Sequence, residues 1–294
     1  MLQTEAFEKS MLEKGASRNT LSSYRSDLSL FAVYCAEQDY EDPAELTGEQ
    51  LSAYFEYLRS IGKSPATVRR ARSSLSTYYT FLQKEGLTDT NPVRETKLEK
   101  SPDLQQTPQV LTHEDIDRLL DYDFGSDEKG LRDKAIVELL YASGIKISSL
   151  IALRETDYQP QTRTIYAEGR RVPLYPSANQ SLLNYIRLSR PYIALPEETA
   201  LFVNLQGSAM SRQGLWKMLR HAADAVGIDK NLTPRLLRRS FAVHLLENGA
   251  GPEDLEKMLG LSDKASVAGY VKLMKGSETI DTYTRFHPRA AKRH

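Results

Sequence analysis

Residues 232–270 read LTPRLLRRSFAVHLLENGAGPEDLEKMLGLSDKASVAGY, and this stretch predicts two helices followed by a third short segment. Its first apolar residues recur at helical spacing, so they predict a helix that ends at Asn248-Gly249. Pro252 starts a second helix with two acidic residues in its first turn, where they suit the helix dipole. A third short segment presents Tyr270. The first helix opens on a basic cluster, Arg235, Arg238 and Arg239.

The same stretch resembles the C-terminal signature of the tyrosine recombinases, most closely those of the bacterial Xer type. That signature reads roughly T-P-H-x-L-R-H-S-F-A-x-H-L-L-x-x-G, then L-G-H, then a tyrosine nine residues later. The resemblance puts Arg238 at the second catalytic arginine and Tyr270 at the nucleophile. Two positions depart from the signature, since Arg235 replaces a histidine and Leu261 replaces a histidine or tryptophan.

The composition sets limits on the class of protein. With 294 residues the chain is long enough for two domains, each with its own core. The formal net charge is zero, so nucleic-acid binding would depend on local clusters of charge. The single cysteine, Cys35, excludes a disulfide framework within the chain, and its position in an apolar helical pattern predicts a buried thiol. Without an apolar run of ~18 residues or a signal peptide, we expect a cytoplasmic protein that makes no membrane contact.

Residues 1–97 show helical patterning and predict a compact bundle of four amphipathic helices. Ser17 caps the second helix, Thr47 opens a capping box for the third, and Pro65 takes the first position of the fourth. Basic residues gather around the start of the fourth helix, and taken alone they are more typical of a solvated face than of a binding site. They are Lys63, Arg69, Arg70 and Arg72.

The fourth helix also carries a resemblance to the family. Residues 64–79 follow its pattern S-x-x-T-x-x-x-x-x-x-x-L-x-x-F-Y, with Tyr78 in place of the phenylalanine. In the family this domain clamps one face of DNA. The resemblance therefore implies that the basic cluster contacts phosphates.

The resemblance covers nearly the whole chain and implies a mainly α fold. It predicts an N-terminal four-helix, SAM-like core-binding domain at 1–97, a linker at 98–110 and an α+β catalytic-type domain at 111–294. The segment YASGIKISSL resembles the family's Y-A-T-G-L-R-x-S-E-L, with Lys146 at the first catalytic arginine and Ser149 at the glutamate. The tail residues 286–290 resemble an H-P-R-A ending that contacts a neighbouring protomer in the family.

Residues 164–174 read TIYAEGRRVPL and predict a β-hairpin that turns at Glu168-Gly169. In the family this hairpin carries a catalytic lysine, and Glu168 lies nearest to that position. Further along, the sequence predicts a strand at 201–204 and then a helix that packs Trp216 into the core. The basic residues expected to contact DNA in this domain are Arg170, Arg171 and Arg239.

Family members cut DNA with a tyrosine and no metal, forming a 3′-phosphotyrosine. Two arginines neutralise the transition state, while a lysine and a histidine assist proton transfer. Tyr270 and Arg238 remain here, but Lys146 lacks the guanidinium fork and Arg235 cannot exchange protons near neutral pH. Leu261 and Glu168 are unsuited to their positions. Because one lost donor commonly costs about 10²–10³ in rate, several losses predict little cleavage.

Three interpretations follow from the sequence. The first is a double-stranded-DNA-binding protein of the family with weak or absent strand cleavage. The alternative is an active site-specific recombinase that uses Tyr270 in a rearranged site, and the third is an interaction module that no longer binds DNA. The resemblance implies self-association, or pairing with a related recombinase, on DNA. We expect no cofactor and no metal, because the five histidines show no metal-ligand spacing and no nucleotide-binding motif occurs.

Overall fold

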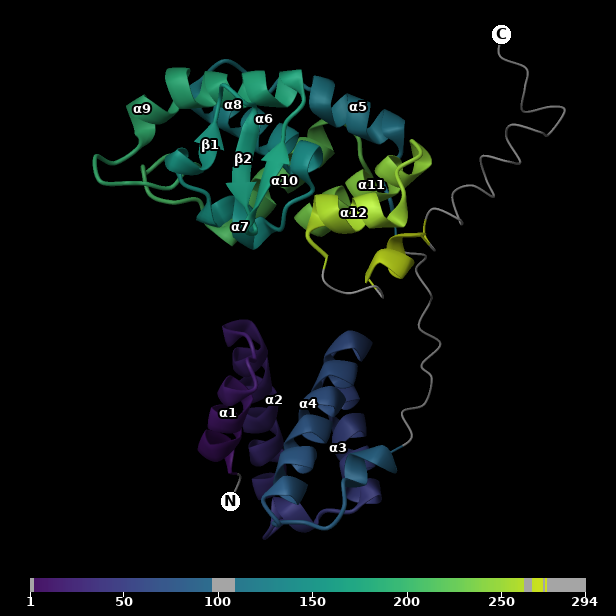
Figure 1. The fold of residues 1–294 in the computed structure, drawn as a ribbon. Helices are drawn as coiled ribbons and strands as arrows, with labels where there is room; N and C mark the ends of the chain where they lie inside the picture. Colours follow the sequence, from purple (N-terminus) through teal and green to yellow (C-terminus); the bar gives the residue numbers. More distant parts are fainter. Residues whose placement is uncertain (1–2, 97–108, 262–265, 272, 274–294) are drawn as a thin grey trace, which may run out of the picture. The chain divides into compact units, whose positions relative to one another are not determined.

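The computed structural model describes residues 3–96, 109–261, 266–271 and 273. By its contacts the chain divides into two compact units, residues 1–106 and 107–294 (Figure 1). Most of the predicted linker and the whole tail segment 286–290 lie outside the described residues. None of the described helices is long and apolar enough to cross a membrane.

The N-terminal unit is the predicted four-helix bundle. The predicted cap at Ser17 and the capping box at Thr47 are present, and α4 begins at Pro65 as predicted. The Ser64 hydroxyl, in addition, accepts a hydrogen bond from the Thr67 backbone N–H group. Cys35 is buried, as predicted. The helices are α1 (Thr4–Glu13), α2 (Arg18–Glu37), α3 (Gly48–Ser60) and α4 (Pro65–Lys84), with 3-10 helices at Pro43–Glu45 and Pro92–Arg94.

The C-terminal unit surrounds a small antiparallel sheet with helices (Figure 1). The sheet order is β1-β2-β3, and Ile165 pairs with Val172 in the β2–β3 hairpin. Its strands are β1 (Tyr158–Gln159), β2 (Thr164–Ala167) and β3 (Arg170–Pro173). Its helices are α5 (His113–Asp121), α6 (Glu128–Ser143), α7 (Ile147–Ala152), the 3-10 helix Glu155–Asp157, α8 (Pro176–Leu188), α9 (Arg190–Ile193), α10 (Arg212–Ala225), α11 (Pro234–Glu247) and α12 (Pro252–Leu259).

The predicted hairpin is confirmed, including the position of its turn. Glu168 has φ +53° and Gly169 has φ +74°, so both turn residues are in the left-handed region. Two-residue hairpin turns of this hand match the twist of the flanking strands. Glutamate is an uncommon residue for the first position, because its Cβ makes the left-handed conformation costly.

Two predictions for residues 201–223 are wrong. Residues 201–204 form no named strand, and the backbone there makes only isolated bridges, Arg154 to Ala200 and Val203 to Ala209. A short buried apolar run does not distinguish a strand from other buried segments, which is why the pattern misled. Trp216 is 45% exposed rather than packed in the core. The buried face of α10 runs through Leu215 and Leu219, and Trp216 is turned about 100° away from Leu215 around the helix.

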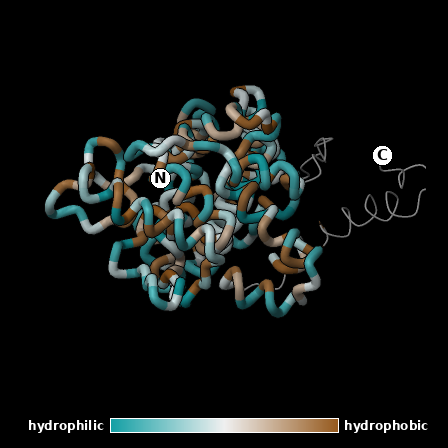
Figure 2. The backbone as a smooth tube through the Cα atoms, turned by 90° about the horizontal axis from the view of Figure 1, so that it is seen from above, coloured by the Kyte–Doolittle hydropathy of each residue, from teal (hydrophilic) through white to brown (hydrophobic). Residues whose placement is uncertain are grey.

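Helix α11 is buried on two sides, which fixes it firmly in the unit. Leu236 and Leu237 join the main core, while Phe241 and Leu246 pack against Leu255 of α12 in a smaller apolar cluster. Apolar residues accordingly recur between polar ones along the helices (Figure 2). The arginines of α11 therefore project from a rigid element.

Candidate functional site

The N-terminus of α11 places three arginines in three different environments. Thr233 caps the helix by accepting a hydrogen bond from the Leu236 N–H group, and Pro234 occupies the first turn. Arg235 is exposed, Arg238 is buried and Arg239 is intermediate. Helix geometry accounts for the difference, because Arg235 and Arg239 are four apart and share a face, whereas Arg238 is turned about 100° from Arg239 toward the interior.

The Arg238 guanidinium joins the ends of two other helices. Its Nη1 donates to the Gly144 carbonyl oxygen at 2.5 Å, and its Nη2 donates to the Leu259 carbonyl oxygen at 2.9 Å. These carbonyls lie at the C-terminal ends of α6 and α12, where a cation also interacts favourably with the helix dipole. Arg238 is 8% exposed, so its main contacts are inside the protein.

Gly144 is required beside this arginine. It ends α6 with φ +56°, and a Cβ there would lie 2.4 Å from Cδ1 of Phe241 and 2.8 Å from Cδ2 of Leu259. Both contacts are too short for carbon atoms. The closeness of α6, α11 and α12 at this point brings the Gly144 carbonyl within reach of Arg238.

The Glu168 carboxylate lies among the residues at the predicted catalytic positions. Its Oε1 accepts hydrogen bonds from the Lys146 backbone N–H and from the Ser149 hydroxyl, both at 2.9 Å. The same oxygen is 3.7 Å from Nη1 of Arg238. Its Oε2 is 3.9 Å from Nζ of Lys146 and 3.8 Å from Nη2 of Arg170. We call Lys146, Ser149, Glu168, Arg170 and Arg238 the Glu168 cluster.

Glu168 is ionised in this cluster. Burial alone would raise the pKa of its carboxyl, but hydrogen bonds from Lys146 and Ser149 and the charges of Arg238 and Lys146 outweigh burial and lower it. Burial lowers the pKa of Arg170, although an arginine stays charged near neutral pH. The sequence reveals neither the contact with Ser149 nor that with Arg238, because these residues lie 19 and 70 positions from Glu168.

Tyr270 packs on the smaller apolar cluster of the C-terminal unit. Residues 266–271 are helical, and Tyr270 packs beside the apolar cluster that contains Phe241 and Leu255. The pKa of Arg239 is lowered by burial and then by the charge of Arg235, while Tyr270 acts in the opposite direction. The guanidinium of Arg238, in contrast, contacts Gly144, Leu259 and Glu168. Leu261 packs in the same apolar cluster as Tyr270.

Some basic residues of the N-terminal unit hold its helices together, and others are exposed to solvent. Arg72 donates three hydrogen bonds to Val93 and Thr96 and so holds the end of the bundle. Arg70 forms an ion pair with the buried Asp27, at 2.8 Å. Lys63 and Arg69 are exposed.

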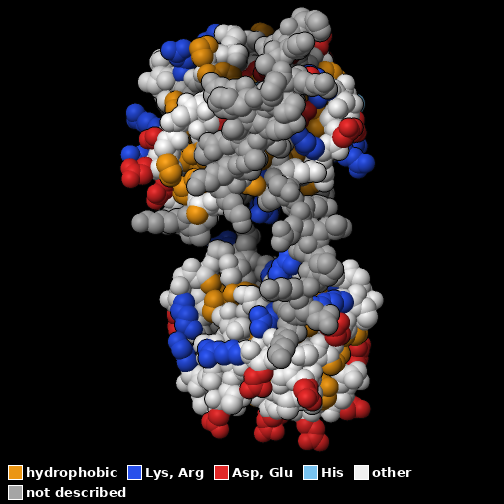
Figure 3. All heavy atoms as spheres, turned by 90° about the vertical axis from the view of Figure 1, so that its right-hand side faces the viewer, with side chains coloured by type: hydrophobic (Ala, Val, Ile, Leu, Met, Phe, Trp, Pro, Cys, Tyr) orange, Lys and Arg blue, Asp and Glu red, His pale blue; other side chains and the backbone are white. Residues whose placement is uncertain are grey.

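Charge is segregated along the bundle. Short loops make consecutive helices antiparallel, so the α1–α2 and α3–α4 loops lie at the same end. In Figure 3, Lys and Arg side chains gather at one end of the N-terminal unit, and Asp and Glu side chains gather at its other end. The basic end carries Lys14, Arg18, Arg59, Lys63, Arg69 and Arg70, and the acidic end carries Glu37, Asp39, Glu41, Asp42, Glu45, Glu49, Glu85 and Asp89.

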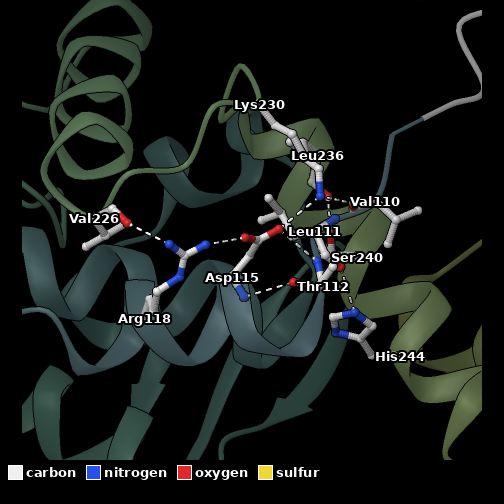
Figure 4. A network of polar contacts seen from close by, with 10 residues as sticks. All are labelled: Val110, Leu111, Thr112, Asp115, Arg118, Val226, Lys230, Leu236, Ser240 and His244. Atoms are coloured by element: carbon white, nitrogen blue, oxygen red, sulfur yellow. Dashed lines mark hydrogen bonds and ion pairs between the residues drawn. The ribbon is translucent and has the colours of Figure 1, made fainter. Parts of the chain in front are cut away.

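A polar network anchors the first residues of the C-terminal unit to α11 (Figure 4). The Leu111 N–H group donates to the Ser240 hydroxyl at 2.9 Å, and the Leu111 carbonyl oxygen is 2.9 Å from Nε2 of His244. Lys230 Nζ bonds the Val110 carbonyl oxygen and the Asp115 carboxylate, both at 2.9 Å. This network fixes the helix that carries the three arginines.

His113, His244 and Glu247 meet beside this network, which their spacing in the sequence does not reveal. Their ligand-type atoms lie within 4.8 Å of one another. Both ring nitrogens of His244 are already in hydrogen bonds, with the Tyr141 hydroxyl and the Leu111 carbonyl oxygen. The two imidazole rings stack with centroids 3.9 Å apart, so their lone pairs do not converge on one point. We interpret the group as a packed, hydrogen-bonded cluster.

Comparison with known proteins defines the family. The phage integrase family profile matches residues 109–276, and the profile for its N-terminal SAM-like domain matches residues 5–86. The chain belongs to the phage integrase family. It is 34% identical to the tyrosine recombinase XerD of Listeria innocua, over 95% of this chain and 96% of that protein. It is 35% identical to XerD of Halalkalibacterium halodurans, over 95% of each chain.

Solved structures show the same fold for this Xer-type family member. The Tn1549 transposon integrase in complex with circular intermediate DNA gives a TM-score of 0.74 at 18% identity, covering 92% of this chain and 95% of that chain. The XerH recombinase bound to a palindromic difH substrate also gives 0.74 at 18% identity, covering 96% and 84%. The mainly α fold, with a small sheet in the C-terminal unit, is therefore confirmed.

Proposed function

We propose that this Xer-type protein binds double-stranded DNA in site-specific recombination and has weak or no strand cleavage of its own. The observation that carries the proposal is the Glu168 carboxylate, which lies between Lys146 and Arg238, the residues at the two predicted catalytic-arginine positions. A family site needs net positive charge there to neutralise the phosphoryl transition state. Here an internal carboxylate neutralises part of that charge.

The surroundings of the nucleophile support the same function. Tyr270 packs beside the apolar cluster of Phe241 and Leu255, whereas Arg238 is engaged with the carbonyl groups of Gly144 and Leu259. Leu261 places an apolar side chain where the family has a hydrogen-bond donor. An active site would have to supply its transition-state donors from other residues.

The basic end of the N-terminal bundle supports binding to DNA. Zero net charge does not oppose this, because phosphate contacts depend on where the cations lie. Relatives in the comparison include recombinases and integrases solved with DNA. A role on chromosomal or mobile-element DNA agrees with the cytoplasmic location that the sequence predicts.

A nicked suicide substrate tests the cleavage part of the proposal, because it traps any covalent phosphotyrosine. The wild-type protein should bind this duplex in a mobility-shift assay and form little covalent product on a denaturing gel. Any product that forms should disappear in Tyr270→Phe, which keeps the ring and removes the nucleophile.

The exposed Tyr192→Phe serves as a matched control, because it makes the same change on α9, away from the Glu168 cluster. Efficient, Tyr270-dependent trapping would contradict the proposal and establish an active recombinase with a rearranged site. Failure to bind duplex at low salt would instead indicate an interaction module that does not bind DNA.

A further inference from the structure

The atoms around Glu168 form an anion site that is only partly satisfied. One buried carboxylate oxygen, Oε2, has no hydrogen-bond partner among the described residues, and neither have Nε and Nη2 of Arg170. Oε2 and Nη2 are 3.8 Å apart, which is an ion pair without a hydrogen bond. Unpaired buried polar atoms are rare in native proteins because each one costs free energy.

The backbone also indicates that Glu168 is held where it is by these contacts. Its φ of +53° places a non-glycine residue in the left-handed region. Residues persist in such conformations when the surrounding structure compensates for them. Here the compensation is available from the Lys146 N–H group and the Ser149 hydroxyl, which both bond the carboxylate.

A phosphodiester matches this group of donors better than a carboxylate does. Lys146, Arg170 and Arg238 surround the carboxylate with three cations, whereas Glu168 has only two oxygens and bonds through one of them. Guanidinium groups suit phosphate oxygens in particular. Lys146 is exposed, so the site is open to solvent on that side.

We propose that the Glu168 carboxylate is an internal substitute for a DNA phosphate, and that a phosphodiester binds in the Glu168 cluster only by displacing it. The inference rests on the proposed function, since it assigns the regulation of that same site. Glu168 thereby weakens DNA binding at this centre. In the absence of DNA it shields Lys146, Arg170 and Arg238 from other anions.

Glu168→Gln tests the inference, because the amide keeps an oxygen for Lys146 and Ser149 and removes the charge. Duplex affinity, measured by fluorescence anisotropy over a salt series, should rise roughly five- to tenfold near ~100 mM salt, and the salt slope should steepen by about one. Glu197→Gln makes the same charge change at an exposed position outside the cluster and should leave both unchanged.

Ser149→Ala provides a second variant that keeps the net charge. It removes one of the two hydrogen bonds that hold the carboxylate, so duplex affinity should rise by about two- to fivefold. If Glu168 and Ser149 have only a structural role, both variants should melt at a lower temperature than wild type and bind duplex no better. That result would show that the inference is wrong.

Inorganic phosphate separates this inference from the proposed function. Replacing chloride with phosphate at constant ionic strength should raise the melting temperature of Glu168→Gln and not that of wild type. If wild type fails to bind duplex, the proposed function fails, and the phosphate measurement still decides the role of Glu168. Equal responses of the two proteins to phosphate would overturn the displacement of Glu168.

Discussion

Arg238 and Arg235 are only three positions apart, yet their side chains lie in different environments. Arg238 is buried and bonded to the carbonyl oxygens of Gly144 and Leu259, whereas Arg235 is exposed on the surface of α11. A buried guanidinium at the ends of two helices contributes to folding whether or not it meets a phosphate. Its removal therefore affects stability as well as DNA binding.

We predict that Arg238→Ala lowers the free energy of unfolding by roughly 2–4 kcal/mol, because it leaves two buried carbonyl oxygens without their donor and removes one of the three cations around the Glu168 carboxylate. Arg235→Ala should cost less than about 0.5 kcal/mol, as surface changes do. Trp216 is the only tryptophan and lies in α10, so its fluorescence during urea unfolding reports on the C-terminal unit. Similar losses in both variants would show that Arg238 has no structural role.

The Asp115 carboxylate helps to hold residues 110–112, just before α5, in place beside α11. Asp115 accepts from Lys230 at 2.9 Å and from Arg118 at 2.7 Å, and it bonds the Thr112 N–H group as part of a capping box (Figure 4). Burial would raise the pKa of Asp115, but these hydrogen bonds outweigh it and lower the pKa to about 2. The carboxylate therefore stabilises the fold in its ionised form.

The pKa of Asp115 is lower in the folded state than in the unfolded state, where it is near 4. The ionised carboxylate therefore stabilises the folded protein fully above about pH 4, and this stabilisation is lost as the pH falls through the folded-state pKa. We predict that Asp115→Asn loses roughly 2 kcal/mol at pH 7, and that the difference from wild type shrinks as the pH falls from about 4 to 2. Urea unfolding of both proteins at several pH values measures it. A constant difference across that range would mean that Asp115 contributes only neutral hydrogen bonds.

Binding to DNA belongs to the scale of the whole molecule, because it depends on how charge is distributed over each unit. The N-terminal bundle concentrates basic residues at the end that carries the α1–α2 and α3–α4 loops (Figure 3). The total charge of the chain conceals this segregation. The C-terminal unit adds exposed Lys146, Arg171 and Arg235.

We predict that Lys63→Glu weakens duplex binding by roughly tenfold or more near ~100 mM salt and lowers the salt slope by about one, since it removes a phosphate contact. Lys84→Glu makes the same change on an exposed lysine at the opposite, acidic end of the bundle, and should alter affinity less than about twofold. Anisotropy titrations at several salt concentrations compare them. If the two reversals weaken binding equally, the basic end is not the DNA surface.

Structural features formed by residues that are close together in the sequence could be predicted from it. The caps at Ser17 and Thr47, the helix start at Pro65 and the turn at Glu168-Gly169 are local hydrogen-bonding or steric arrangements, and all of them are confirmed. The prediction for residues 201–204 failed because a buried apolar run does not specify its backbone partners. The roles of the predicted catalytic and DNA-contacting residues stay predictions.

The family, the four-helix bundle, the hairpin and the substitutions at the catalytic positions can all be predicted from the sequence alone, because residue types at fixed spacings encode them. The packing of separate elements, in contrast, brings Glu168 to Arg238, bonds Arg238 to the ends of α6 and α12, and sets Tyr270 beside Phe241 and Leu255. Each of these contacts joins residues that different elements carry. Their electrostatic energies depend on separations of a few ångströms and on burial, which only the packing of those elements sets.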